Sequence, residues 1–246
     1  MCSGLLVIIP AFNEAATIAQ VVDGVVTLNF NVLVVDDGST DHTCELAANA
    51  GAMVLRLPFN VGVGGALRAG FRYAVDHDYS SVVQVDADGQ HPIHQISDLV
   101  NVAQQHDAHL VIGSRYLSSD ATLSPSLFRR LAMGCLGIIA SRSAGRKLTD
   151  STSGFRIIRQ PLLSEFAREF PSYYLGDTFE ATVAAARAGY RIVEIPASLT
   201  PRTHGRSSTS SMSAILLTAK VLLVTGARMC KPLEYIRLTR NEPSNF

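Results

Sequence analysis

Two aspartates stand two residues apart in the sequence VVQVDADGQHP, which covers residues 82–92. They are Asp86 and Asp88, and they follow an apolar, strand-like run. Residues i and i+2 of a strand point to the same side of its sheet, so both carboxylates can face one point. Paired carboxylates suit a hard divalent cation such as Mg²⁺ or Mn²⁺. The pair predicts a metal site, and the alternative is an acidic cap at the entry to a turn.

His91 is a further candidate ligand, although a histidine before a proline in a turn is more often structural.

Two other predicted strands also end in polar residues. The first ends in Pro10-Ala11-Phe12-Asn13-Glu14 and the second in Asp36-Asp37-Gly38-Ser39. One such strand end is usually a cap. Three that meet at one edge of a sheet favour a ligand site, because ligands of open α/β sheets bind beyond the carboxyl ends of the strands.

Short apolar runs alternate with helical patterns through the first half of the chain. The runs cover residues 4–10, 31–37, 52–57, 81–86 and 109–114, with helical spacing between them. This order predicts βαβ units around a mostly parallel sheet with helices on both faces. Beyond residue 115 we expect helices over 127–146 and 178–189, strands over 154–159 and 190–196, and a last apolar helix after the stretch 204–211.

The composition excludes several classes of protein. Apolar residues make up 47% of the 246, which excludes a disordered chain, and 21 basic residues balance 21 acidic ones, so we expect no nucleic-acid binding. The four cysteines have no metal-site spacing and fit a reducing compartment. The N-terminus lacks the features of a signal peptide. No apolar run reaches the 18 or so residues of a spanning helix, and the nearest, 211–227, contains Lys220.

The glycine-rich turn NVGVGGALRAGF (60–71) follows the third strand, whereas a dinucleotide fingerprint would follow the first. Its glycines predict either close packing of helix on sheet or a loop of a donor site. The chain contains neither the phosphate-loop pattern GxxxxGK[ST] nor the hydrolase pattern GxSxG.

Six motifs in order resemble a known family. They are VIIPAFNE, VVDDGSTD, NVGVGGA, VDADGQHP, GSRY and DSTSGFR. Their order is similar to that of glycosyltransferase family 2, and within it to the dolichyl- or polyprenyl-phosphate mannose or glucose synthases. The resemblance implies a GT-A type nucleotide-diphospho-sugar transferase fold over residues 1–210. Residues 211–246 would then form an amphipathic helix and a tail on the domain or on a membrane surface.

The resemblance also implies roles for individual residues. The nucleotide pocket would contain Pro10, Phe12, Glu14 and Gly62, with Asp37 on the base. The metal and the donor diphosphate would be bound by Asp86, Asp88 and Gln90. The acceptor phosphate would be bound by Arg115 and by Arg129 or Arg130, and Arg202 would close over the donor. The sequence departs from the family pattern in two places: Ser207 and Ser208 stand where a lysine is common, and Met133 stands where a serine often contacts the acceptor.

Asp150 occupies the place of a catalytic base in related enzymes that use hydroxyl acceptors. The alternative is that Asp150 has a structural role, in which it caps a helix or a turn and interacts with Arg156. A phosphate acceptor is already anionic near neutral pH, so it needs guanidinium groups to hold it in line more than it needs a base.

We therefore expect an inverting, metal-dependent enzyme that moves mannose or glucose from a GDP- or UDP-hexose to a polyprenyl or dolichyl phosphate. It would lie on the cytoplasmic face of the membrane without crossing it, alone, as a homo-oligomer or with a membrane partner subunit. One alternative is a family 2 enzyme acting on a soluble or polysaccharide hydroxyl. The other is a non-catalytic protein that binds nucleotide sugars.

Overall fold

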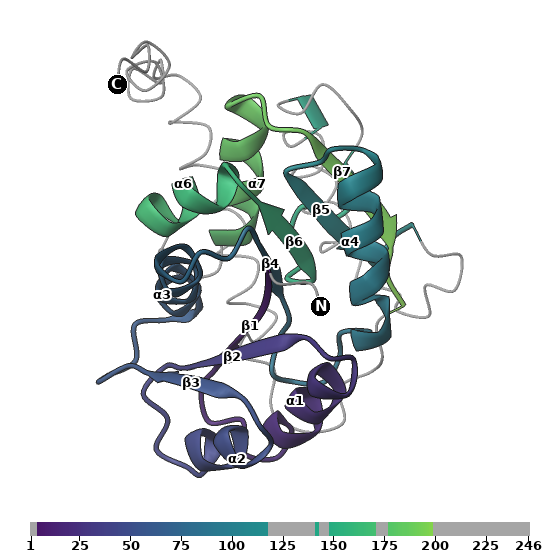
Figure 1. Cartoon of the computed structure of the whole chain (residues 1–246). Coiled ribbons are helices and arrows are strands. Elements are labelled where there is room, and N and C mark those ends of the chain that lie inside the picture. Colours follow the sequence, from purple (N-terminus) through teal and green to yellow (C-terminus); the bar gives the residue numbers. More distant parts are fainter. Residues whose placement is uncertain (1–3, 118–140, 143–147, 171–176, 199–246) are drawn as a thin grey trace, which may run out of the picture. The chain divides into compact units, whose positions relative to one another are not determined.

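A seven-stranded sheet forms the centre of the protein, in the strand order β3-β2-β1-β4-β6-β5-β7 (Figure 1). The computed structural model describes residues 4–117, 141–142, 148–170 and 177–198, with only the backbone at residue 177. The strands are β1 (Leu5–Ala11), β2 (Asn31–Asp36), β3 (Met53–Arg56), β4 (Ser81–Gln84), β5 (Leu110–Ser114), β6 (Arg156–Arg159) and β7 (Ile192–Pro196).

The direction of β6 decides what meets at the functional edge of the sheet. Six strands run parallel to one another, and β6 lies antiparallel between β4 and β5. Its first residue, Arg156, pairs with Gln84 at the end of β4 and with Ile112 near the end of β5. The segment just before β6 therefore lies at the same edge as the carboxyl ends of the parallel strands.

Helices cover both faces of the sheet, as the alternating pattern predicts. One face carries α1 (Ile18–Thr27), α2 (Thr43–Asn49) and α4 (Ile96–Gln105), the last preceded by the 3₁₀ turn η1 (Ile93–Gln95). Burial of β-branched and leucine side chains joins this face into one core, which includes Val7, Ile9, Val22, Val25, Val34, Ile96 and Leu99.

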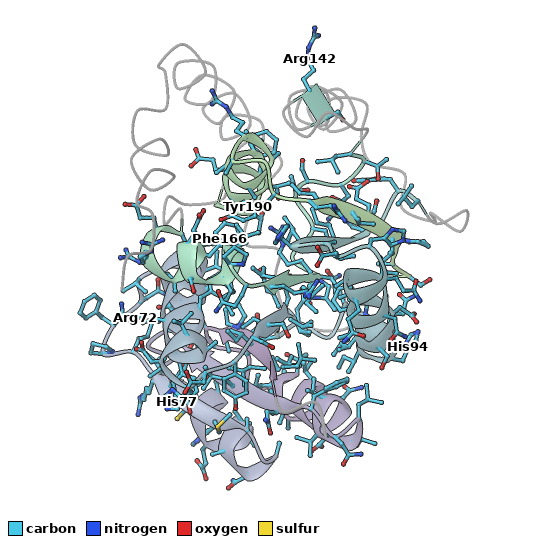
Figure 2. The ribbon with its side chains drawn as sticks, turned by 45° about the horizontal axis from the view of Figure 1, so that its top comes forward. Arg72, His77, His94, Arg142, Phe166 and Tyr190 are labelled. Atoms are coloured by element: carbon cyan, nitrogen blue, oxygen red, sulfur yellow. The ribbon has the colours of Figure 1, made fainter. Side chains whose placement is uncertain are left out.

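The other face carries α3 (Val63–Asp76), α6 (Leu162–Glu169) and α7 (Asp177–Arg187). Phe166 of α6, labelled in Figure 2, packs against Phe71 of α3, with ring centroids 6.1 Å apart. Gly70 allows α3 to approach the sheet, because an added Cβ would lie 2.8 Å from the Ile8 side chain. The packing interpretation of the glycine-rich stretch is thus confirmed for Gly70.

Three details differ from the sequence-based expectations. Strand β4 ends at Gln84, so Asp86 and Asp88 lie in the turn beyond it, and strand alternation does not apply to them. Helical spacing begins at Glu14 in the sequence, but helix α1 begins at Ile18, because the carbonyl of Glu14 first accepts bonds from the N–H groups of Thr17 and Ile18 in a turn. Helix α6 was not expected at all, since its eight residues are too few to give a clear periodic signal.

The chain divides into two units, residues 1–208 and 209–246. All described residues belong to the first, and the predicted C-terminal helix and tail (211–246) lie outside the described residues. Most of the predicted helix over 127–146 also lies outside them. In the part of the chain that the structure describes, none of the helices is both long and apolar enough to span a bilayer.

Candidate active site

Hydrogen bonds between side chains and backbone join the ends of β1 and β2. The N–H of Asn13 donates to Ser39 Oγ at 2.9 Å, and Asn13 Oδ1 accepts from the N–H of Thr40 at 2.9 Å. The N–H of Glu14 donates to Thr43 Oγ1 at 2.8 Å. Asn13 also adopts a positive φ of 56°, which asparagine tolerates better than most residues. The motifs AFNE and DGST thus form one connected surface at the edge of the sheet.

Asp37 connects this surface to the start of α3. Its two carboxylate oxygens accept bonds from the N–H groups of Val61 and Gly62, at 2.8 and 2.9 Å. The turn can approach so closely because residue 38 is a glycine: an added Cβ there would lie 2.8 Å from the carbonyl carbon of Phe59. Burial raises the pKa of Asp37 above its usual 3.8, although the two backbone donors oppose the rise. The structure therefore places Asp37 and Gly62 together and assigns Asp37 a structural task that the sequence did not predict.

The remaining predicted nucleotide residues lie at the end of β1. Pro10 and Glu14 are half-buried, whereas the Phe12 side chain is 45% exposed. Glu14 accepts a bond from the hydroxyl of Thr17 at 3.3 Å. A large exposed aromatic ring beside polar strand ends is available to a planar ligand. The role of these residues in binding a nucleotide stays a prediction.

The predicted metal residues Asp86, Asp88 and Gln90 share one turn after β4. The side chain of Asp86 is 41% exposed, and Asp88 Oδ1 accepts a bond from the N–H of Gln90 at 3.1 Å. Across the described residues, no group of three or more His, Cys, Asp or Glu side chains is placed to hold a metal ion. Two carboxylates and an amide oxygen still fit Mg²⁺ or Mn²⁺, because such ions complete their shells with water and substrate oxygens. Metal coordination by this turn stays a prediction.

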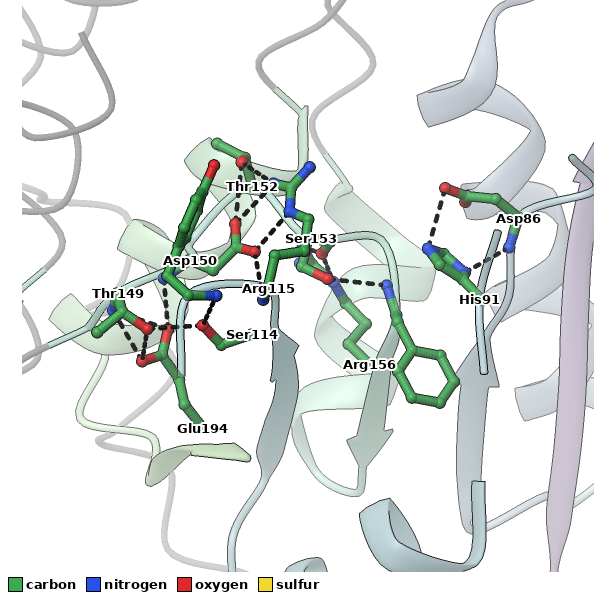
Figure 3. A network of polar contacts seen from close by, with 12 residues as sticks. Asp86, His91, Ser114, Arg115, Thr149, Asp150, Thr152, Ser153, Arg156 and Glu194 are labelled. Carbon is green, nitrogen blue, oxygen red and sulfur yellow. Dashed lines mark hydrogen bonds and ion pairs between the residues drawn. The ribbon is translucent and has the colours of Figure 1, made fainter. Parts of the chain in front are cut away.

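His91 is buried and bonds to Asp86. Its Nδ1 accepts from the N–H of Asp86 at 2.9 Å, and its Nε2 lies 3.4 Å from Asp86 Oδ2 (Figure 3). The ring packs against Phe155, with centroids 5.3 Å apart. A backbone N–H can only donate, so the ring proton belongs on Nε2, facing the carboxylate. These contacts favour the structural interpretation of His91, which here orients a predicted metal ligand.

Arg115 and Asp150 form a two-pronged ion pair at the same edge. Arg115 Nε donates to Asp150 Oδ2 and Arg115 Nη2 to Asp150 Oδ1, both at 2.7 Å, and the N–H of Arg115 donates to Oδ2 at 3.0 Å. Thr152 Oγ1 accepts a further bond from Nη2 at 2.8 Å. Among the described residues, Arg115 Nη1 has no hydrogen-bond partner, and the side chain is 27% exposed. One edge of the guanidinium is held and the other remains available to an anion.

The partner of Asp150 corrects one expectation. Asp150 pairs with Arg115, whereas the predicted partner Arg156 donates to the carbonyls of Ser153 and Thr178. Burial alone would raise the pKa of Asp150, but the hydrogen bonds and the charge of Arg115 hold that pKa below its usual 3.8. A carboxylate held in this way is a weak base. Burial opposes the rise in the pKa of Arg115, the bond and charge of Asp150 raise it, and the Asp86 charge adds to the rise, so the predicted acceptor and metal residues lie within electrostatic range of each other.

Gly154 brings the segment before β6 against the turn that carries Asp86. An added Cβ at this position would lie 2.9 Å from both carboxylate oxygens of Asp86. Only a glycine leaves room for this approach, because real Cβ atoms do not come closer than about 3.0 Å to other heavy atoms. The motif DSTSGFR thus contacts two predicted site residues. Its Asp150 binds Arg115, and its Gly154 leaves room for the carboxylate of Asp86.

Sequence reasoning missed Glu194, whose carboxylate accepts the backbone N–H groups of Thr149 and Asp150 (Figure 3). It lies on β7, far along the chain from both. No motif signals it, and the only hint is a carboxylate within the apolar strand YRIVEIP. Arg129, Arg130, Met133, Arg202, Ser207 and Ser208 lie outside the described residues.

Comparison with known proteins agrees with this arrangement. The sequence profile of glycosyl transferase family 2 matches residues 6–166. The chain belongs to glycosyl transferase family 2. The match spans β1 through the middle of α6, and so includes the turns that carry Asp37, Asp86 and Asp88 as well as Arg115 and Asp150.

Relatives in this family carry names that point to lipid phosphates. The chain is 34% identical over 218 residues to the undecaprenyl-phosphate mannosyltransferase of Micrococcus luteus, which covers 84% of this chain and 87% of the relative. It is 33% identical over 217 residues to the polyprenol monophosphomannose synthase of Mycolicibacterium smegmatis, covering 83% and 80%.

Solved structures confirm the fold. Glucosyl-3-phosphoglycerate synthase from Mycobacterium tuberculosis, in complex with Mn²⁺, UDP and glucosyl-3-phosphoglycerate, superposes with a TM-score of 0.68. The match covers 94% of this chain and 81% of that one at 21% identity. The predicted GT-A type fold, with its mostly parallel sheet and flanking helices, is confirmed.

Proposed function

We propose that this family 2 glycosyltransferase moves a hexose, mannose or glucose, from a GDP- or UDP-sugar to a polyprenyl phosphate with inversion at the anomeric carbon. The observation that carries the proposal is Arg115, whose guanidinium is held by Asp150 on one edge and is available on the other. A fixed guanidinium is a good receptor for a phosphate monoester. The names of the relatives support a lipid phosphate as acceptor.

The residues then divide the work by charge. Asp86, Asp88 and Gln90 would hold a divalent cation, which supplies positive charge to the departing nucleotide diphosphate. Arg115 holds the acceptor so that one phosphate oxygen faces the anomeric carbon. That oxygen forms the new bond as the bond from the carbon to the diphosphate oxygen breaks. No proton has to be removed from the nucleophile, so the weakly basic Asp150 fits a phosphate acceptor better than a hydroxyl acceptor.

Apolar side chains beside Arg115 support a lipid acceptor. Tyr116 and Leu117 follow it directly and are 39% and 44% exposed. Exposed apolar groups next to a phosphate-binding arginine match a headgroup that continues into a hydrocarbon chain.

We propose that the protein works at the cytoplasmic face of a membrane. Flotation with liposomes that contain anionic lipid and polyprenyl phosphate tests this, and a protein that stays at the bottom at low salt contradicts it.

Transfer assays with a panel of GDP- and UDP-hexoses, with and without polyprenyl phosphate, test the activity. We expect transfer that requires the lipid phosphate and stops in EDTA. Asp88→Asn should abolish it without loss of fold, whereas Asp98→Asn, an exposed carboxylate change on α4, should not. Transfer to a soluble hydroxyl that outpaces transfer to the lipid phosphate would favour the hydroxyl-acceptor alternative.

A further inference from the structure

Glu194 gathers three hydrogen-bond donors of one loop onto a single carboxylate. Its Oε1 accepts from the N–H groups of Thr149 and Asp150 at 2.9 and 2.8 Å. Its Oε2 accepts from the N–H and the hydroxyl of Thr149 at 2.7 and 2.9 Å. An amide side chain would fit less well, because its NH₂ at the Oε2 position would lie 2.7 Å from the N–H of Thr149, one donor against another. The contacts of this site therefore favour a carboxylate over an amide.

The loop is also connected to the end of β5. The hydroxyls of Thr149 and Ser114 lie 2.7 Å apart, and Ser114 Oγ accepts the N–H of Tyr116 at 3.2 Å. Because β5 pairs with β7 and places Ile112 opposite Glu194, the carboxylate and the loop are held to the same pair of strands. Glu194, Thr149 and Ser114 form a chain of hydrogen bonds beside Asp150 and Arg115 (Figure 3).

Asp150 is the link from this chain to the guanidinium. Its backbone N–H is bound by Glu194, and its carboxylate binds Nε and Nη2 of Arg115. The direction of Arg115 Nη1 therefore depends on the position of Asp150. The position of Asp150 depends in turn on the bond from its backbone N–H to Glu194. A shift of the loop would turn the guanidinium even though every residue in contact with an acceptor is intact.

We propose that Glu194 is a positioning residue that aims Arg115 at the phosphate of the acceptor. It touches neither the acceptor nor the donor and acts through Thr149 and Asp150. The proposal rests on the proposed function only for the identity of the acceptor. The orientation of Arg115 can be measured without any acceptor, so the two proposals can fail separately.

The first measurement is NMR of arginine Nε–H groups in the whole protein. The Arg115 signal, assigned with Arg115→Lys, should be shifted and protected from exchange by its 2.7 Å bond to Asp150. Glu194→Gln should move this signal and speed its exchange. The matched control is Glu165→Gln, which removes another half-buried carboxylate, one that accepts a bond from Tyr190 just before β7. The control should leave the Arg115 signal in place.

The second measurement is a double-mutant cycle on transfer. Glu194→Gln should raise the KM for a short-chain polyprenyl phosphate by about tenfold, as expected for a displaced charged contact, and should change the KM for the donor by less than about twofold. In an Arg115→Ala background the same change should add nothing, because the residue through which Glu194 acts is gone. A purely structural role would give equal losses in both backgrounds.

An unmoved Arg115 signal, or an effect of Glu194→Gln that persists in Arg115→Ala, overturns the proposal. If Glu194→Gln does not fold, Thr149→Val replaces it: this change removes only the hydroxyl between Ser114 and Glu194, and it should move the Arg115 signal in the same direction. If the wild-type protein does not use polyprenyl phosphate, the proposed function falls, and the NMR comparison still decides the role of Glu194.

Discussion

Gly154 leaves no room for a side chain beside Asp86, and this gives a prediction at the scale of one residue. A Cβ would lie 2.9 Å from both carboxylate oxygens, so Gly154→Ala must push the carboxylate aside. Because Asp86 is proposed to hold the cation, we expect Mn²⁺ affinity in the presence of UDP to fall by about tenfold or more. Titration calorimetry or the electron paramagnetic resonance of free Mn²⁺ measures this.

Gly24→Ala on α1 is the matched control for that change. Its Cβ would meet only the end of the Ile93 side chain at 3.0 Å, which can move, so Mn²⁺ affinity should be unaffected. Equal Mn²⁺ affinity in wild type and Gly154→Ala would show that Asp86 does not hold the cation. Both variants should melt within a few degrees of wild type.

At the scale of an element, Asp37 holds the turn that starts α3. Its two oxygens bind two adjacent N–H groups, whereas an asparagine would present an NH₂ to one of them. Asp37→Asn should therefore lower the free energy of unfolding by about 1–3 kcal/mol. It should also raise the donor KM more than it lowers kcat, because the turn lies beside the predicted nucleotide pocket. Urea unfolding and donor kinetics measure the two effects.

Asp76→Asn serves as the control at the other end of α3. It removes an exposed ion pair with Arg72, for which a loss below about 1 kcal/mol is expected. If kcat collapses in Asp37→Asn at saturating donor while KM stays constant, Asp37 belongs to the chemical step and not to the donor pocket.

At the scale of the whole molecule, the Arg115–Asp150 pair joins the end of β5 to the segment before β6 and should affect acid stability. The folded state lowers the pKa of Asp150 below 3.8, so the pair stabilises the fold above that pH and loses this contribution as the pH falls through the folded pKa. Asp150→Asn should cost about 3 kcal/mol at neutral pH, since Arg115 loses its buried partner. The difference from wild type should be constant between pH 5 and 8 and shrink below about pH 4.

Urea unfolding of both proteins across this range provides the check. A difference that changes between pH 6 and 8 would mean that Asp150 titrates near neutrality, as a catalytic base for a hydroxyl acceptor would. Arg72→Met is the control, because it removes only the exposed ion pair with Asp76. Its difference from wild type in the free energy of unfolding should be small, and so should the change of that difference at acid pH.

Much of the fold and part of the site could be predicted from the sequence, because the signals are local. Apolar runs predicted the strands within a few residues, since burial on both faces of a parallel sheet demands continuous apolar stretches. The polar ends of β1, β2 and β4 were expected at one edge, and these three strands are neighbours. The motifs led to the family, which the profile match confirms.

What only the tertiary structure decided are the contacts between segments far apart in the chain. The antiparallel direction of β6 brings Gly154 to Asp86, and Asp150 pairs with Arg115, 35 positions away, instead of the nearby Arg156. Glu194 reaches the loop from 44 positions beyond Asp150. The periodicity of apolar residues indicates only which face of an element is buried. The hydrogen-bond partners of a buried carboxylate depend on which donors the packing of the strands places beside it. The sequence therefore determined which residue types lie at the edge of the sheet, and the packing of β5, β6 and β7 determined which of them hold one another.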